Sequence, residues 1–269
     1  MRMRSPSPGP WRDLTLTSAA GFSVPGMTTT KTERIEGAVA LVTGANRGLG
    51  RHFARQLLER GAARVYAAAR RPETVGLPGT VPLRLDITDD DEVRATAAAA
   101  GDVTLLVNNA GISRFTNLVT SELADVRAEM DTNYWGTLAV VRAFAPVLAA
   151  NGGGAILNVL SAQSWHPYPG TNGYHAAKAA QWALTNGVRT ELAAQGTLVT
   201  GLHLGAVDTD FSAAYDGPKG DPADTVRAGL DGIEAGAAEV LADEWSARVK
   251  RSLAEDPTRL YEEIRAGAV

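Results

Sequence analysis

Short apolar runs recur along the chain and predict the strands of one sheet. The first, VALVTG at 39–44, is continuously apolar and ends in glycine, which is typical of a parallel strand buried on both faces. Further runs lie at 64–70, 81–87, 103–111, 154–161, 198–205 and 238–243. Helical patterns separate most of them, at 48–60, 90–100, 121–149 with a break, 174–194 and 222–236.

Strands that alternate with helices favour a parallel sheet with helices on both faces. Right-handed crossovers make such a sheet doubly wound, and its ligands bind beyond the carboxyl ends of the strands. We therefore predict a single-domain α/β Rossmann fold of about seven strands, spanning residues 37–269. Residues 1–36 are rich in Pro, Ser, Thr and Arg without apolar periodicity, so we expect a disordered extension, with Met27 as an alternative first residue.

The composition of the chain excludes several classes of function. A net charge of −4 offers no basic field for nucleic acid, and the absence of cysteine excludes thiolate chemistry and disulfides. The four histidines lack metal-ligand spacing, so no metal is expected. No apolar run approaches the roughly 18 residues that span a membrane, and we expect a cytoplasmic protein with a small-molecule partner.

The stretch TGANRGLG at 43–50 joins the first strand to the first helix. Its glycines permit a tight turn and a close approach of ligand, and the helix N-terminus behind them favours phosphate. The spacing differs from the common G-x-G-x-x-G, so a turn that uses glycine only for geometry remains the alternative. The predicted nucleotide contacts here are Gly44, Asn46, Arg47, Gly48, Leu49 and Gly50.

The end of the second strand bears on the choice of cofactor. An acidic residue here would bind the ribose hydroxyls of NAD, whereas arginine accommodates the 2′-phosphate of NADP. Arg70 and Arg71 stand at this point, and no acid precedes Glu73. Arg47 is a further candidate partner for this phosphate. The alternative interpretation is that all three arginines are solvated surface residues. The sequence predicts NADP(H) in preference to NAD(H).

Tyr174 and Lys178 are neighbours on the face of a predicted helix. A phenol is a weak acid with a pKa of about 10, and a nearby ammonium lowers that pKa, which suits proton transfer to or from a carbonyl or alcohol oxygen. Ser161 ends the fifth strand and can donate to the same oxygen. A surface Tyr–Lys pair and a serine cap are the alternatives; no G-x-S-x-G elbow marks Ser161 as a nucleophile.

Taken together, these residues resemble the classical short-chain dehydrogenases/reductases from about Val39 to Asp243. The matching features are TGANRGLG, Asp86 after the third strand, NNAG at 108–111, Asn133 in NYWG, Ser161, and Y-x-x-x-K at 174–178. The resemblance implies that Tyr174 is the general acid or base, that Lys178 tunes it and holds the nicotinamide ribose, that Ser161 orients the substrate oxygen, and that Asn133 supports a proton relay.

The resemblance also implies further cofactor contacts. These are Asp86 and Ile87 at the adenine, Asn108, Ala110 and Gly111 along the adenosine, and Gly205, Val207 and Thr209 near the nicotinamide. Leu204 stands where the family often has proline. Family members commonly pair the helices predicted here at 121–149 and 174–194, which implies a homodimer or homotetramer.

The long Gly/Pro-rich segment 209–224 is the predicted substrate lid. Ile112, Ala162, Trp165 and Tyr168 are candidate walls of the substrate pocket, with packing beneath the loop as the alternative for the aromatic pair. No basic cluster accompanies them, so a neutral carbonyl compound or alcohol is the expected substrate of an NADP-dependent carbonyl reductase or alcohol dehydrogenase. A non-catalytic dinucleotide sensor, or a dehydratase or epimerase on the same fold, remains an alternative.

Overall fold

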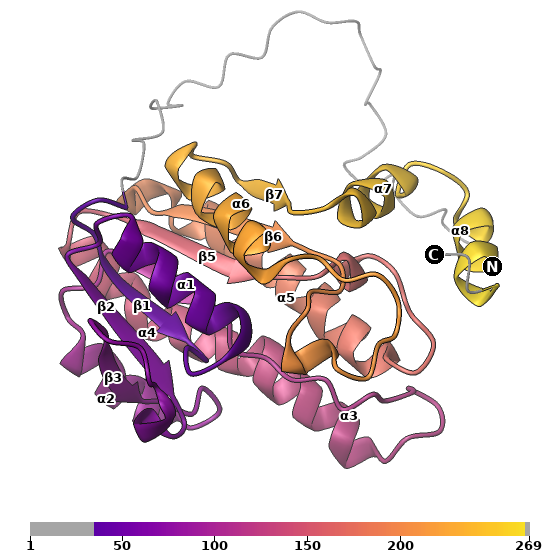
Figure 1. Cartoon of the computed structure of the whole chain (residues 1–269), viewed down its shortest axis with the longest axis horizontal. Coiled ribbons are helices and arrows are strands. Elements are labelled where there is room, and N and C mark those ends of the chain that lie inside the picture. The colour runs from indigo at the N-terminus through magenta and orange to yellow at the C-terminus, as the bar shows by residue number, and fades with distance from the viewer. Residues whose placement is uncertain (1–34, 267–269) are drawn as a thin grey trace, which may run out of the picture. The chain divides into compact units, whose positions relative to one another are not determined.

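The computed structural model describes residues 35–266, and the predicted extension at 1–36 lies almost entirely outside this range. One sheet of seven parallel strands runs in the order β3-β2-β1-β4-β5-β6-β7 (Figure 1). The strands are β1 Val39–Thr43, β2 Arg64–Ala69, β3 Val81–Arg84, β4 Leu105–Asn108, β5 Ala155–Val159, β6 Leu198–His203 and β7 Glu239–Leu241. The order reverses direction between β1 and β4, so the predicted doubly wound Rossmann fold is confirmed.

Helices cover both faces of this sheet. They are α1 Gly48–Glu59, α2 Asp90–Ala99, α3 Leu123–Met130, α4 Thr137–Ala150, α5 Asn172–Glu191, α6 Pro222–Glu234, α7 Glu244–Ser252 and α8 Pro257–Arg265. Successive residues of β1 point to opposite faces: Val42 joins an apolar core under α1 and α6, whereas Leu41 joins a second core under α2, α4 and α5. Figure 1 shows α1 and α6 side by side over one face.

The break predicted inside 121–149 is a π-helical turn, Asp131–Gly136, between α3 and α4. Gly136 lies close to the loop after β3, because a Cβ on it would meet the Ile87 side chain at 2.8 Å. π-Helical turns of this kind often accompany functional sites. This one carries Asn133, one of the candidate site residues.

Two C-terminal helices were not anticipated from the sequence. α7 begins after Asp243, whose carboxylate accepts from Ser246 N at 2.7 Å, and α8 begins after Asp256, which accepts from Thr258 N at 2.9 Å. Both are short and strongly amphipathic, with Asp as the N-cap. No helix in the described part of the chain is both long enough and apolar enough to cross a membrane.

Candidate active site

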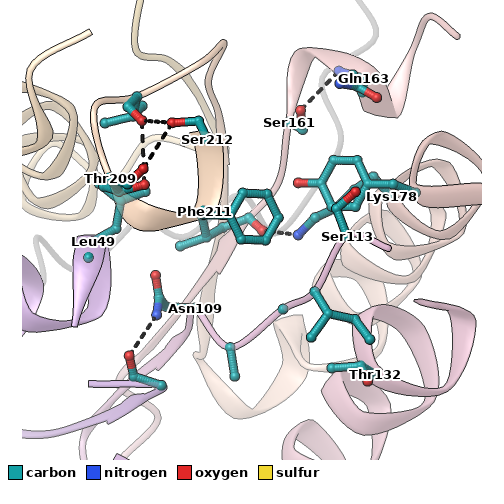
Figure 2. Close-up of a pocket in the computed structure, with 18 of the residues that line it drawn as sticks. Leu49, Asn109, Ser113, Thr132, Ser161, Gln163, Lys178, Thr209, Phe211 and Ser212 are labelled. Atoms are coloured by element: carbon teal, nitrogen blue, oxygen red, sulfur yellow. Dashed lines mark hydrogen bonds between the residues drawn. The ribbon is translucent and has the colours of Figure 1, made fainter. Parts of the chain in front are cut away.

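A cleft of about 1560 Å³ follows the carboxyl edge of the sheet. The loops after β1, β2 and β4 line one end, and those after β5 and β6 line the other. Figure 2 shows residues of both ends, from Leu49 and Asn109 to Ser161 and Lys178. The cleft therefore lies where the switch point of the strand order predicts a ligand.

The glycine turn at the first end has a shape that only glycine permits. Gly44 and Gly48 have φ of 66° and 51°, in the left-handed region. A Cβ on Gly50 would lie 2.1 Å from Gly44 O, so Gly50 supports the turn from behind and does not line the cleft. α1 starts here without a side-chain cap and without an acidic residue in its first turn. Its first amide N–H groups thus remain available to a phosphate.

Several predicted cofactor contacts converge around this turn. Lining the cleft are Gly44, Asn46, Arg47, Gly48, Leu49, Arg70, Asp86, Ile87, Ala110, Gly111, Gly205, Val207 and Thr209. Arg47 pairs with Asp210 at 3.3 Å, and both side chains are largely exposed. Because an exposed pair of this kind is weak, the guanidinium can exchange Asp210 for an anionic ligand.

Two further predicted contacts, in addition to Gly50, lie outside the cleft. Arg71 does not line the cleft, although the preceding Arg70 does. Asn108 is buried within the sheet, where its Nδ2 donates to Asn158 Oδ1 at 2.8 Å. The following residue, Asn109, lines the cleft instead, and its Nδ2 donates to Thr43 O at 2.9 Å and braces the glycine turn (Figure 2). The alternating direction of side chains in β4 explains the one-residue difference.

Ser161 and Tyr174 meet at the second end of the cleft. Ser161 follows β5 and begins the short turn Ala162–Ser164, with its Oγ accepting from Gln163 N at 3.1 Å. Tyr174 lies in the first turn of α5 and is almost fully buried. Burial raises the pKa of Tyr174, a hydrogen bond with Ser161 lowers it, and the charge of Glu129 raises it, for a net increase. The phenol is therefore protonated at neutral pH.

Lys178 lies beneath this tyrosine. Its Nζ donates to Val159 O and to Gln181 Oε1, both at 2.8 Å, and lies 5.6 Å from the centre of the Tyr174 ring. Burial lowers the pKa of Lys178 to about 7. The sequence reasoning expected the ammonium to lower the pKa of Tyr174. In this structure burial instead raises the pKa of the phenol and lowers the pKa of the lysine, because the low-polarity surroundings disfavour both charged forms.

Asn133 is buried and does not line the cleft. Its Nδ2 donates to Ile112 O at 2.9 Å, and its Oδ1 accepts from Ile112 N at 3.2 Å, so the side chain fastens the loop after β4. A chain of hydrogen bonds links it to the lysine: Thr137 Oγ1 donates to Asn133 O, and Gln181 Nε2 donates to Thr137 Oγ1. The sequence reasoning missed Gln181 and Thr137, although Gln181 stands three residues after Lys178. The relay role of Asn133 stays a prediction.

Three of the four predicted substrate walls line the cleft: Ile112, Ala162 and Tyr168. Trp165 does not, and that prediction is wrong. Its ring stacks on His203 with the centres 3.8 Å apart, and it packs with Val249 of α7 beneath the loop. The unanticipated helix α7 supplies this apolar contact, which draws the indole away from the cleft.

The segment after β6 forms a wall over the reacting side chains. Phe211 lies 5.8 Å, ring to ring, from Tyr174, and Figure 2 shows it pointing across the cleft. Leu204 O accepts from Ala162 N at 2.8 Å, so the turn is anchored without the proline that the family often has. Tyr215, which belongs to the predicted lid segment, also lines the cleft, as does Trp245, which was not anticipated from the sequence. The lid function of 209–224 stays a prediction.

Comparison with known proteins agrees with this geometry. Residues 38–219 match the family of short chain dehydrogenases. A protein of Mycobacterium tuberculosis described as an uncharacterized oxidoreductase is 40% identical over 210 residues, which cover 76% of this chain and 83% of that protein. The crystal structure of a short chain dehydrogenase from Burkholderia cenocepacia in complex with NADP is 40% identical, with a TM-score of 0.82 over 86% of this chain and 98% of that one.

A second structure shows the same fold with the other cofactor. The 3-ketoacyl-(acyl-carrier-protein) reductase from Brucella melitensis complexed with NADH is 27% identical, with a TM-score of 0.71 over 76% of this chain and 96% of that one. The fold and cleft define a Rossmann-type oxidoreductase. The chain belongs to the short-chain dehydrogenase/reductase family, whose members use a nicotinamide cofactor.

Proposed function

We propose that the protein is an NADP(H)-dependent oxidoreductase that interconverts a neutral carbonyl compound and its alcohol. The observation that carries this proposal is the convergence of Ser161, Tyr174 and Lys178 on the cleft that also contains the glycine turn. A nicotinamide dinucleotide held in that cleft would supply the hydride. The protein's own residues bind the cofactor, orient the substrate and transfer the proton.

Tyr174 is the proton donor in carbonyl reduction. Its raised pKa keeps the phenol protonated, which is the form that can donate to the developing alkoxide. The Ser161 hydroxyl, hydrogen-bonded to the phenol, orients the substrate oxygen toward it. Lys178, whose Nζ lies 5.6 Å from the centre of the phenol ring, returns a proton to Tyr174, and Gln181 holds the lysine in place by accepting from its Nζ.

The preference for NADP(H) is supported by Arg47 and Arg70, which both line the adenosine end of the cleft. Either guanidinium suits a 2′-phosphate. Replacing Arg70 by Asp should weaken NADPH use far more than NADH use, as measured by kcat/KM for each cofactor. Arg71→Asp is the matched control, because the neighbouring arginine stands outside the cleft. Equal losses with both cofactors in the Arg70 variant would refute the preference.

The substrate is proposed to be neutral and partly apolar. Aromatic and aliphatic side chains surround the reacting groups, namely Ile112, Phe115, Tyr168, Phe211, Tyr215 and Trp245. Such a wall favours an apolar ketone or aldehyde over a small anionic keto acid. We further propose a homodimer or homotetramer, supported by the alanines that α4 and α5 leave partly or fully exposed. We also propose that the protein acts in the cytoplasm.

The test is NADPH oxidation by wild type and Tyr174→Phe over a panel of carbonyl compounds, with the alcohol product identified. Wild type should turn over acetophenone or cyclohexanone in preference to pyruvate, and Tyr174→Phe should turn over none of them. Equal turnover by both proteins would exclude Tyr174 as the acid. An isomerised or dehydrated product without NADPH consumption would instead favour a different reaction on this fold.

A further inference from the structure

Glu129, in the last turn of α3, carries a buried carboxylate that the scheme above does not use. Its side chain is fully enclosed, and within residues 35–266 no Lys, Arg or His forms an ion pair with it. Enclosing a charge without a counter-ion is costly unless strong hydrogen bonds compensate. The hydrogen-bond partners of this carboxylate therefore indicate its role.

Its two oxygens hold the segment that follows β4. Oε1 accepts from Arg114 N at 2.5 Å, and Oε2 accepts from Thr116 Oγ1 at 2.5 Å. One helical turn later, Asn133 fastens the same segment at Ile112, and its Nδ2 also donates to Glu129 O at 2.9 Å. Residues 112–116, which form part of the cleft wall, are thus clamped at both ends.

The same carboxylate lies against the start of α5. Gly173, which directly precedes Tyr174, donates from its N to Thr116 O at 3.2 Å. A Cβ on Gly173 would lie 2.3 Å from Glu129 Oε2 and 2.1 Å from Thr116 Oγ1, so the absence of a side chain permits this contact. The positive end of the helix dipole stabilises a carboxylate at this place. Glu129 therefore contacts both the cleft wall at 112–116 and the start of α5, the helix that carries the Tyr174 phenol.

The Glu129 carboxylate also acts on the Tyr174 phenol through its charge. The groups that face Tyr174 are Lys178 from α5, Ser161 from the end of β5, Glu129 from α3 and Phe211 from the segment after β6. Among them, the charge of Glu129 adds to burial in raising the pKa of Tyr174, and the Ser161 hydrogen bond opposes both.

We propose that Glu129 is a positioning residue for the reaction. Its carboxylate joins the 112–116 segment to the start of α5 and so fixes the Tyr174 hydroxyl relative to the carbonyl of the substrate. Glu129 does not line the cleft, so it acts through Tyr174 and not on the substrate. This inference rests on the proposed function, in which Tyr174 donates the proton.

The test compares wild type with Glu129→Gln and Thr116→Val, using NADPH and acetophenone, or the ketone that wild type turns over best. Glu129→Gln preserves shape but removes the charge. We expect kcat to fall about tenfold to a hundredfold, with the Kd for NADPH changed by less than about twofold. In the pH profile of kcat, the alkaline limb should move to lower pH, because the negative charge of Glu129 no longer opposes ionisation of the Tyr174 phenol.

Glu122→Gln is the matched control. Glu122 is exposed at the N-terminal end of the same helix and makes no capping bond, so all three quantities should stay at wild-type values. Thr116→Val removes one donor to the carboxylate but leaves the charge. It should lower kcat about threefold to tenfold and leave the alkaline limb in place.

Wild-type kcat in Glu129→Gln would overturn the inference, as would a fall in kcat with an unmoved alkaline limb, since that pattern indicates only a structural role. If Glu129→Gln does not fold, Thr116→Val decides: wild-type kcat overturns the inference, and the predicted fall at unchanged NADPH affinity supports it. Tyr174→Phe separates the two proposals. Full turnover in that variant refutes the proposed function, whereas an inactive Tyr174→Phe beside a fully active Glu129→Gln refutes only the inference.

Discussion

The two ends of the cleft are built in opposite ways. At the glycine turn, backbone geometry forms the site, and the charged side chains Arg47 and Asp210 are largely exposed. At the other end, side chains form the site, and Tyr174 and Lys178 are 8% and 4% exposed. Water screens charges at the first end, whereas burial shifts ionisation at the second. Substitutions should therefore act through backbone shape at one end and through proton affinity at the other.

The largest expected effect at the glycine end follows from Gly50→Ala. Because its Cβ would lie 2.1 Å from Gly44 O, the turn must move. We expect the affinity for NADPH, measured by fluorescence titration, to fall at least about a hundredfold. Gly187→Ala is the control: a Cβ on this exposed glycine of α5 would meet no atom within 4 Å, so the variant should bind NADPH normally and unfold at a higher temperature. Unchanged affinity in Gly50→Ala would contradict the shape argument.

The next effect concerns the hydrogen bonds behind Lys178. Gln181→Leu removes the link between Lys178 Nζ and Thr137 Oγ1. We expect kcat to fall about tenfold or more while the Kd for NADPH is preserved. Gln195→Leu, in the turn after α5, removes a comparable amide that is remote from the cleft and should leave kcat unchanged. A Gln181 variant with wild-type kcat would show that Lys178 works without support from Gln181.

A third prediction concerns stability against pH. Burial lowers the pKa of Lys178 to about 7, whereas the unfolded chain keeps the ordinary value of 10.5. Below roughly pH 7 both states are charged, and burial of the ammonium destabilises the fold by its full amount. Between pH 7 and 10.5 only the unfolded chain keeps the proton, so this penalty shrinks as the pH rises. The stability of Lys178→Met relative to wild type should thus decline by a few kcal/mol between about pH 7 and pH 10. Urea unfolding of both proteins measures this.

Lys219→Met serves as the control for that experiment, since Lys219 is only half-buried in the segment after β6. Its stability relative to wild type should stay constant over the same pH range. A constant difference for Lys178→Met would mean that the buried ammonium is solvated more fully than the structure indicates.

The smallest effect is expected from Asp210→Asn. The ion pair with Arg47 is exposed, so its loss should leave stability nearly unchanged. Release of Arg47 should improve NADPH affinity about twofold at low salt, and the improvement should vanish at high salt. Isothermal titration at two salt concentrations checks this, and an affinity that falls in the variant would show that Asp210 itself assists binding.

The same contrast explains what the sequence revealed. Continuous apolar strands and the TGANRGLG turn are local patterns, so the fold and the glycine end were predictable from them. Ser161, Tyr174 and Lys178 followed from spacing and from resemblance to the family. Gln181, Thr137 and Glu129 were missed, because their roles depend on contacts between α3, α4 and α5 that no local pattern encodes. Trp165 was misplaced for the same reason, since α7 provides its packing partner.

In the proposed reaction, Tyr174 delivers the proton during hydride transfer from a normally bound cofactor. Single-turnover oxidation of bound NADPH by a ketone that wild type reduces, followed in wild type and Tyr174→Phe, tests it most directly. We expect an unchanged Kd for NADPH and a rate of hydride transfer about a hundredfold to ten-thousandfold lower in the variant. Equal single-turnover rates in the two proteins would contradict it.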